Sequence, residues 1–117
     1  MLWVASSKRD LKQFPDEVQD HIGFALYQAQ IGLIHRDAKP MSGLGAGVMV
    51  VVSDFDTNAY RAVYVVRFAQ AMYVLHAFQK TSTRGIATPK FDIDLIGRRL
   101  KAATEHYETV FGKGSKR

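Results

Sequence analysis

The sequence predicts an α+β fold in which a small antiparallel sheet carries helices packed on one face, leaving the other face open. The middle of the chain holds three runs rich in valine and tyrosine, and a few residues separate the last two, which favours an antiparallel hairpin. The two ends hold segments with apolar residues at three- and four-residue spacing, which is typical of amphipathic helices. A length of 117 residues suits a single domain spanning 1–117.

The N-terminal part is expected to form a short strand and two helices. The opening LWVAS predicts the strand, and the spacing of Ser7 and Asp10 predicts a capping box that starts a short helix. Pro15, followed by two acidic residues, predicts the start of a longer helix, and Gly32 predicts its end. The apolar face of that helix comprises Val18, Ile22, Ala25 and Ala29.

The rest of the chain is expected to form a loop over 35–47, three strands and a final helix. The strands are VMVVVSDF, AYRAVYVVRF and AMYVLHAFQK, and the near-continuous hydrophobicity of the first indicates burial on both faces. Thr88 and Pro89 predict the start of the last helix, and residues 113–117 predict a flexible basic tail. The apolar stripe of this helix comprises Ile93, Ile96, Leu100, Ala103 and Tyr107.

Composition excludes several classes of function. The chain has no cysteine, so disulfides and thiolate chemistry are ruled out. Its apolar runs are far shorter than the ~20 residues that span a bilayer, and no signal peptide is recognisable, so we expect a cytoplasmic protein without membrane contact. The formal charge of +5 and pI of about 9.6 favour nucleic acid or an acidic protein as partner.

No cofactor or metal is expected from the sequence. The histidines are scattered without the spacing of a metal site, and helix capping explains most carboxylates. Ser53 has no histidine–acid partners in the sequence that would indicate acyl-transfer chemistry. The four histidines are His21, His35, His76 and His106.

The hairpin places a polar cluster on the open face. A turn over 68–71 would set Phe78 opposite Arg61, His76 opposite Val63, and Val74 opposite Val65. Side-chain alternation then puts Arg61, His76, Phe78 and Lys80 on one face, with Arg84 in the following loop. The core face would hold Tyr60, Tyr64, Tyr73, Leu75 and Ala77. Cations pair with phosphates and aromatic rings stack on bases, although solvated sheet cations that discourage edge pairing would give the same pattern.

Several of these motifs, in this order, resemble the RelE/HigB superfamily of bacterial toxins, and more narrowly its phage-derived, HigB-like branch. The resemblance rests on YRAVYVVRFAQAMYVLHAFQKTS followed by TPKFDIDLIGRRLK, and on the opening SSKRDLKQFPDEVQDHIGFAL. It implies a RelE-like fold, and a toxin of a type II toxin–antitoxin pair that cuts mRNA on the ribosome without a metal. It also implies a cognate antitoxin, often a helix-turn-helix DNA-binding protein, through which the complex reaches operator DNA.

The resemblance also implies roles for individual residues. Arg61 and Lys80 would stabilise the transition-state charge, and His76 would act as acid or base or else be a structural histidine. Phe78 and Arg84 would contact RNA. The predicted strand VMVVVSDF, the second along the chain after LWVAS, lacks the basic residues of the most active relatives. Lys39 and Arg36 in the loop before it are candidates to supply that charge.

Two alternatives to the endonuclease remain open. The chain could be a non-catalytic module of the same fold that binds RNA or protein, which the neutral second strand favours. It could also be a structural interaction protein whose basic surface pairs with an acidic, antitoxin-like partner.

Overall fold

The computed structural model describes residues 1–81 and 89–112, with backbone alone for Lys80 and Thr81. Within these residues the chain forms three helices and a five-stranded sheet in the order β1-β5-β4-β3-β2. The strands are β1 (Leu2–Trp3), β2 (Ala38–Pro40), β3 (Val48–Phe55), β4 (Asn58–Val65) and β5 (Tyr73–Thr81). The helices are α1 (Ser7–Leu11), α2 (Asp16–Gln30) and α3 (Lys90–Phe111). The predicted α+β class is confirmed.

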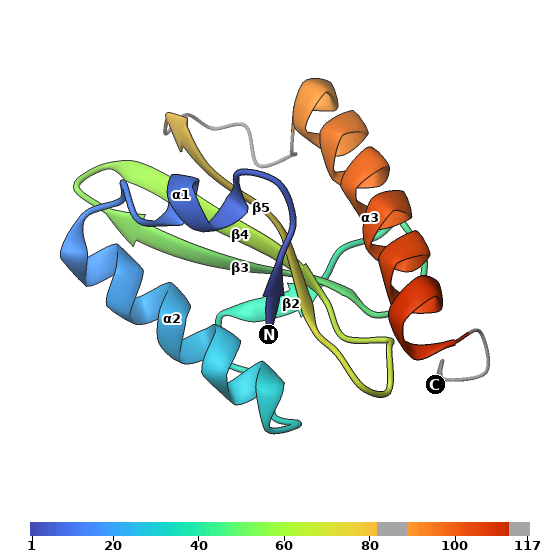
Figure 1. The fold of residues 1–117 in the computed structure, drawn as a ribbon. Helices are drawn as coiled ribbons and strands as arrows, with labels where there is room; N and C mark the ends of the chain where they lie inside the picture. Colours follow the sequence, from blue (N-terminus) through green and yellow to red (C-terminus); the bar gives the residue numbers. More distant parts are fainter. Residues whose placement is uncertain (82–88, 113–117) are drawn as a thin grey trace.

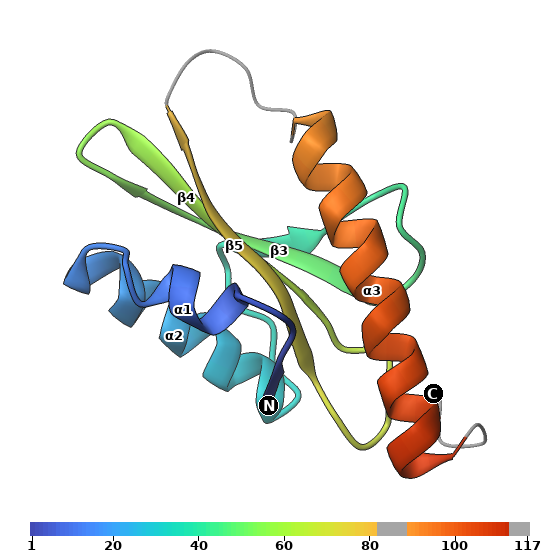
Figure 2. The same ribbon diagram turned by 45° about the horizontal axis from the view of Figure 1, so that its top comes forward.

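The helices pack on both faces of the sheet, so the prediction of a single covered face was wrong in this respect. Met49 and Val51 of β3 join a core with α1 and α2, whereas Val48 and Val50 join a second core with α3. Figures 1 and 2 show the sheet between the blue helices α1 and α2 and the orange-red helix α3. The continuous hydrophobicity of β3 follows from this arrangement, because successive side chains enter different cores.

Two strands at the sheet edges extend the predicted meander. β1 pairs with β5 in parallel, so the sheet is mixed. β2 lies within the segment 35–47 that was predicted to be a loop, and it pairs antiparallel with β3. A three-residue strand containing a proline gives little sequence signal, since its partner β3 supplies the pairing.

The predicted hairpin register holds at one end and fails at the other. Arg61 lies opposite Phe78 and Val63 opposite His76, as predicted. Beyond this point Tyr64 pairs with Val74, so Leu75 is an extra residue in β5, a β-bulge. The bulge turns Leu75 and Tyr73 towards α3, whereas they were predicted to share a face with Tyr64.

The first helix begins differently from the prediction. Ser6, not Ser7, precedes the helix, and its hydroxyl donates to Asp10 Oδ2 at 2.7 Å. Ser7 is buried and donates to the Val74 carbonyl at 3.1 Å, which fastens α1 to β5. Thr88 and the basic tail 113–117 lie outside the described residues.

Candidate functional site

The polar cluster predicted on the hairpin lies beneath α3. Arg61 on β4 is half-buried between Val52 of β3 and Phe78 of β5. Since Val52 and Phe78 pack against the α3 core, Arg61 points to the same face. Lys80 pairs with Ala59 through its backbone, but its side chain and Arg84 lie outside the described residues.

His76 is a buried member of this cluster, with 6% of its surface exposed. It lies opposite Val63 in the regular part of the hairpin and so faces α3, where Nε2 lies 2.8 Å from Asp92 Oδ1. Its ring stacks on Phe78 with centroids 4.6 Å apart and an interplanar angle of 16°. Packing and hydrogen bonding therefore fix the orientation of the imidazole.

Arg99 of α3 completes the cluster. Its guanidinium donates to the Leu75 carbonyl at 3.0 Å and to Ser6 Oγ at 3.1 Å, and lies 3.4 Å from His76 Nδ1. Burial lowers the pKa of Arg99, while Asp10 opposes this shift. Because an arginine can only donate, a hydrogen bond between Arg99 and His76 requires Nδ1 as the acceptor, which leaves Nε2 to donate to Asp92.

Sequence reasoning assigned no role to Asp92 or Arg99. Asp92 was explained by its place in the first turn of a helix, where a carboxylate is expected. A spacing of seven residues puts Asp92 and Arg99 on the same face of α3, next to the apolar stripe. That spacing was the signal available, but it does not identify His76 as the partner.

The structure separates the two loop cations that were predicted to act together. Lys39 is exposed on β2 opposite Val50, so it shares the α3 face with Arg61, with β3 between them. Arg36 has a side chain 90% exposed, and its Nε lies 4.0 Å from Asp37. Lys39 is therefore placed to add charge near Arg61, whereas Arg36 belongs to another cluster.

That second cluster lies on the α2 side, and sequence reasoning missed it. His21 of α2 contacts Ser53 Oγ of β3 through Nδ1 at 2.7 Å and Asp37 Oδ2 through Nε2 at 2.8 Å. The hydrogen bond from His21 holds the pKa of Asp37 below its usual value. Ser53 does have histidine and acid partners, contrary to the prediction, but it is 3% exposed, which keeps a substrate from its hydroxyl. Acyl-transfer chemistry therefore does not fit this arrangement.

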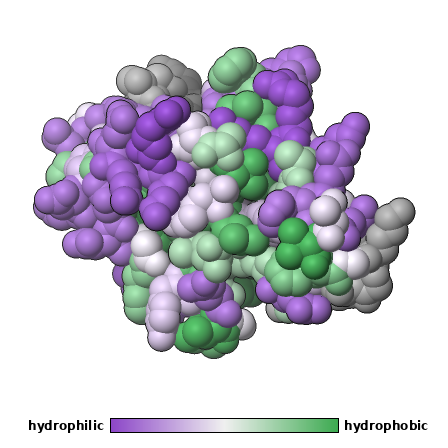
Figure 3. All heavy atoms as spheres, viewed as in Figure 1, coloured by the Kyte–Doolittle hydropathy of each residue, from purple (hydrophilic) through white to green (hydrophobic). Residues whose placement is uncertain are grey.

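An exposed apolar patch covers the C-terminal end of α2 and the residues after it. Its members are Phe24, Tyr27, Ile31, Leu33 and Ile34, which are 53–71% exposed. Figure 3 shows hydrophobic side chains gathered over the lower middle of the molecule, where α2 ends. A contiguous patch of large apolar side chains is uncommon on a monomer and is typical of an interaction surface.

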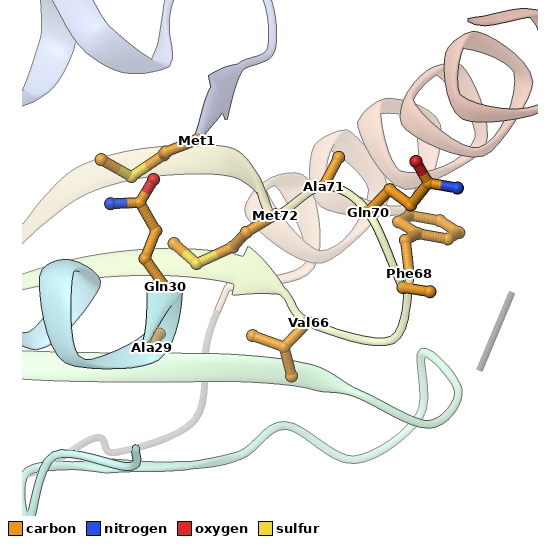
Figure 4. A pocket seen from close by; sticks show the side chains of 9 residues that line it. Met1, Ala29, Gln30, Val66, Phe68, Gln70, Ala71 and Met72 are labelled. Atoms are coloured by element: carbon orange, nitrogen blue, oxygen red, sulfur yellow. The ribbon is translucent and has the colours of Figure 1, made fainter. Parts of the chain in front are cut away.

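An open surface hollow of about 350 Å³ at the apolar patch is lined by Phe24, Gln28, Ile34, His35 and Arg36. Two smaller hollows lie at the patch or beside it. One, of about 160 Å³, is lined by Leu33, Ile34 and the buried Tyr64 among others. The other, of about 190 Å³, lies between the end of α2 and the turn after β4, with Met1, Gln30 and Met72 on one side (Figure 4). Both are smaller than the ~300 Å³ of typical small-molecule pockets, so their size fits inserted side chains better.

Comparison with known proteins identifies one family. The family model "Phage derived protein Gp49-like (DUF891)" matches residues 9–101, well over half of the chain. This family is associated with RelE-like toxin–antitoxin systems. No curated protein and no solved structure matches the chain. Among the described helices, none is long and apolar enough to span a membrane. The matched segment contains α2, the whole hairpin and most of α3, and the chain therefore belongs to the Gp49-like family of phage-derived proteins.

Proposed function

We propose that this protein is the toxin of a type II toxin–antitoxin pair, a metal-independent mRNA endonuclease that acts on the ribosome and inhibits translation. The observation that carries the proposal is the family match over residues 9–101, because this family is associated with RelE-like toxin–antitoxin systems. The shared face of Arg61, His76 and Phe78 supports it independently. Action on ribosomes would place the protein in the cytoplasm.

The proposed reaction uses the ribose 2′-hydroxyl as the nucleophile. The hydroxyl attacks the adjacent phosphate while a base removes its proton, and an acid protonates the leaving oxygen. Arg61 and Lys80 are assigned to the negative charge that develops on the phosphorane, and a contact of this kind contributes about 3–4 kcal/mol. Lys39, on the same face, would hold the RNA backbone together with Arg84, and Phe78 would stack on a base.

His76 is assigned to acid–base catalysis in this proposal. In the structure its ring faces Asp92 and Arg99 and is almost closed to solvent. A substrate reaches His76 only if the N-terminal part of α3 moves away from β5. A fixed His76 that positions Phe78 and α3 is the alternative role, and the two roles predict different kinetics. Loss of a proton-transfer group lowers kcat with little effect on KM, whereas loss of a positioning group changes both.

The apolar patch supports a protein partner, which we propose to be an acidic antitoxin that also carries a helix-turn-helix DNA-binding domain. The exposed side chains of Phe24, Tyr27 and Ile31 lie on one side of α2, at the spacing that an apposed helix or strand would cover. The formal charge of +5 favours an acidic partner. Operator DNA would then be reached through the antitoxin.

The proposal is tested by cleavage of a defined mRNA on programmed ribosomes, mapped by primer extension. We expect cuts within the A-site codon for the native chain, and a loss of ~100-fold or more in rate for Arg61→Ala and Lys80→Ala. Lys12→Ala is the matched control, since Lys12 is an exposed cation next to α1, on the other side of the sheet. Unchanged cleavage in the first two variants would refute the assigned site.

A second candidate function is a non-catalytic module that binds RNA or protein. The burial of His76 favours it, because an acid–base group closed to solvent does not serve catalysis in this conformation. A folded native chain that binds RNA with strong salt dependence but makes no cuts would establish this function. Binding to the antitoxin alone, without RNA, would instead indicate a structural interaction protein.

A further inference from the structure

Three side chains that offer metal-binding atoms meet at the junction of α2 with the edge of the sheet. They are His21 on α2 and His35 and Asp37 in the segment before β2, and their ligand atoms all lie within 4.8 Å of one another. Asp37 Oδ2 is 2.8 Å from His21 Nε2 and 3.8 Å from His35 Nδ1. The positions 21, 35 and 37 show no regular spacing, so the group is visible only in the folded chain.

We propose that His21, His35 and Asp37 form a binding site for a divalent transition-metal ion of the zinc type. Two imidazole nitrogens and a carboxylate oxygen are the donor set that Zn²⁺ takes in sites with three protein ligands. Tetrahedral bonds of ~2.0–2.2 Å separate neighbouring donor atoms by about 3.4 Å. The distances of 2.8 and 3.8 Å from Asp37 bracket that value, so small side-chain rotations complete the site.

The surroundings of His21 fit the role of a metal ligand. A histidine that binds a metal with one nitrogen usually hydrogen-bonds through the other, which fixes the ring. His21 Nδ1 lies 2.7 Å from the hydroxyl of Ser53, a buried residue of β3, and this contact directs Nε2 towards Asp37. Ser53 is therefore a positioning residue of the proposed site.

His35 is also held in place, although it must exchange one contact. Its ring packs near His21, with centroids 5.3 Å apart, and meets Phe24 edge to face at 5.8 Å. Its Nδ1 accepts a hydrogen bond of 3.0 Å from the Asp37 backbone, which a metal at that nitrogen would replace. The side chains of His21 and Asp37 are 31% and 39% exposed, which leaves access for the ion and for water as a fourth ligand.

A metal at this position would link α2 to the edge of the sheet. Asp37 directly precedes β2, which pairs with β3 alone on the outside of the sheet. The site lies on the α2 side of the sheet and Arg61 on the α3 side, so it goes beyond the proposed cleavage reaction. Its role is to hold the edge strand against α2, beside the apolar patch.

The test is direct titration of tag-free, chelator-treated protein with Zn²⁺ in competition with a chromophoric chelator. We expect one ion per chain, and a loss of affinity in His35→Ala and Asp37→Asn that exceeds the ~10–100-fold typical of residues outside the ligand set. Ser53→Ala should weaken binding by about 10-fold. Asp37→Asn keeps the size of the side chain, so its effect does not depend on a folding defect.

His106→Ala provides the matched control. His106 is exposed on α3, and its ring bonds to the Tyr73 hydroxyl at 2.7 Å, away from the proposed site. This variant should bind Zn²⁺ like the native chain, and Zn²⁺ should raise the melting temperature of both but not of Asp37→Asn. Equal affinity of the native chain and Asp37→Asn, or an equal loss in His106→Ala, would overturn the proposal. Because the experiment measures Zn²⁺ binding, its result tests the metal site independently of whether the protein cleaves RNA.

Discussion

Two histidine–aspartate pairs with the same nitrogen–oxygen distance lie on opposite faces of the sheet. His76 and Asp92 are 2.8 Å apart with side chains 8% and 17% exposed, whereas His21 and Asp37, also 2.8 Å apart, are 31% and 39% exposed. The first pair is closed over by α3 and bonded to Arg99, and the second opens to solvent beside a further histidine. The same two residue types therefore form a packed, buried network on one face and, on the other, the accessible group that we propose as a metal site.

The largest expected effect is a difference in the free energy of unfolding between variants that remove the histidine of each pair. His76→Ala removes a buried, stacked ring and leaves Asp92 without its partner, which should lower the free energy of unfolding by about 3 kcal/mol. His21→Ala should cost much less, since water can replace its contact with Asp37. Urea unfolding followed by circular dichroism measures both. Equal losses in the two variants would show that burial does not distinguish the pairs.

The next prediction concerns the arginine that ties α3 to β5. Arg99→Ala removes the bonds to the Leu75 carbonyl and Ser6 and should lower the free energy of unfolding by about 1–2 kcal/mol. Its neighbour Arg98 is exposed, and Arg98→Ala should stay within about 0.5 kcal/mol of the native chain. The same unfolding assay compares the two variants. An equal effect of both substitutions would contradict a stabilising role for the hydrogen bonds of Arg99.

The smallest effect appears at alkaline pH and compares the two cores. Burial raises the pKa of Tyr64 on the α2 face, and burial with the nearby Tyr107 raises the pKa of Tyr73 on the α3 face. A raised folded-state pKa gives stability that is complete below the unfolded value of about 10 and is lost as the pH rises through the folded value.

Tyr64→Phe should therefore lose less stability than the native chain between about pH 8 and about pH 11. Tyr27→Phe provides the matched comparison, because it makes the same substitution at an exposed tyrosine. Urea midpoints across this range measure the difference. If stability falls with pH in Tyr64→Phe just as it does in the native chain, the raised pKa of Tyr64 is contradicted.

The local elements followed closely from the sequence because their signals are local. Hydrophobic spacing predicted the buried faces of α2 and α3, and the hairpin predicted that Arg61 lies opposite Phe78. The face of Tyr73 and Leu75 was predicted wrongly, since the extra residue in β5 reverses the side chains between the bulge and the hairpin turn. The covering of both sheet faces was signalled by β3, whose continuous hydrophobicity already required two cores.

By itself the sequence determined the order of every described element except β2, the basic charge and the family, because composition, periodicity and motif order lie along the chain. Only the tertiary structure decided which polar groups meet. Asp92 and Arg99 reach His76 because α3 crosses the bulge of β5, and His21 reaches Asp37 and Ser53 because α2 packs over the edge of the sheet. Contacts between distant segments depend on how the layers pack, and no spacing along one segment encodes them.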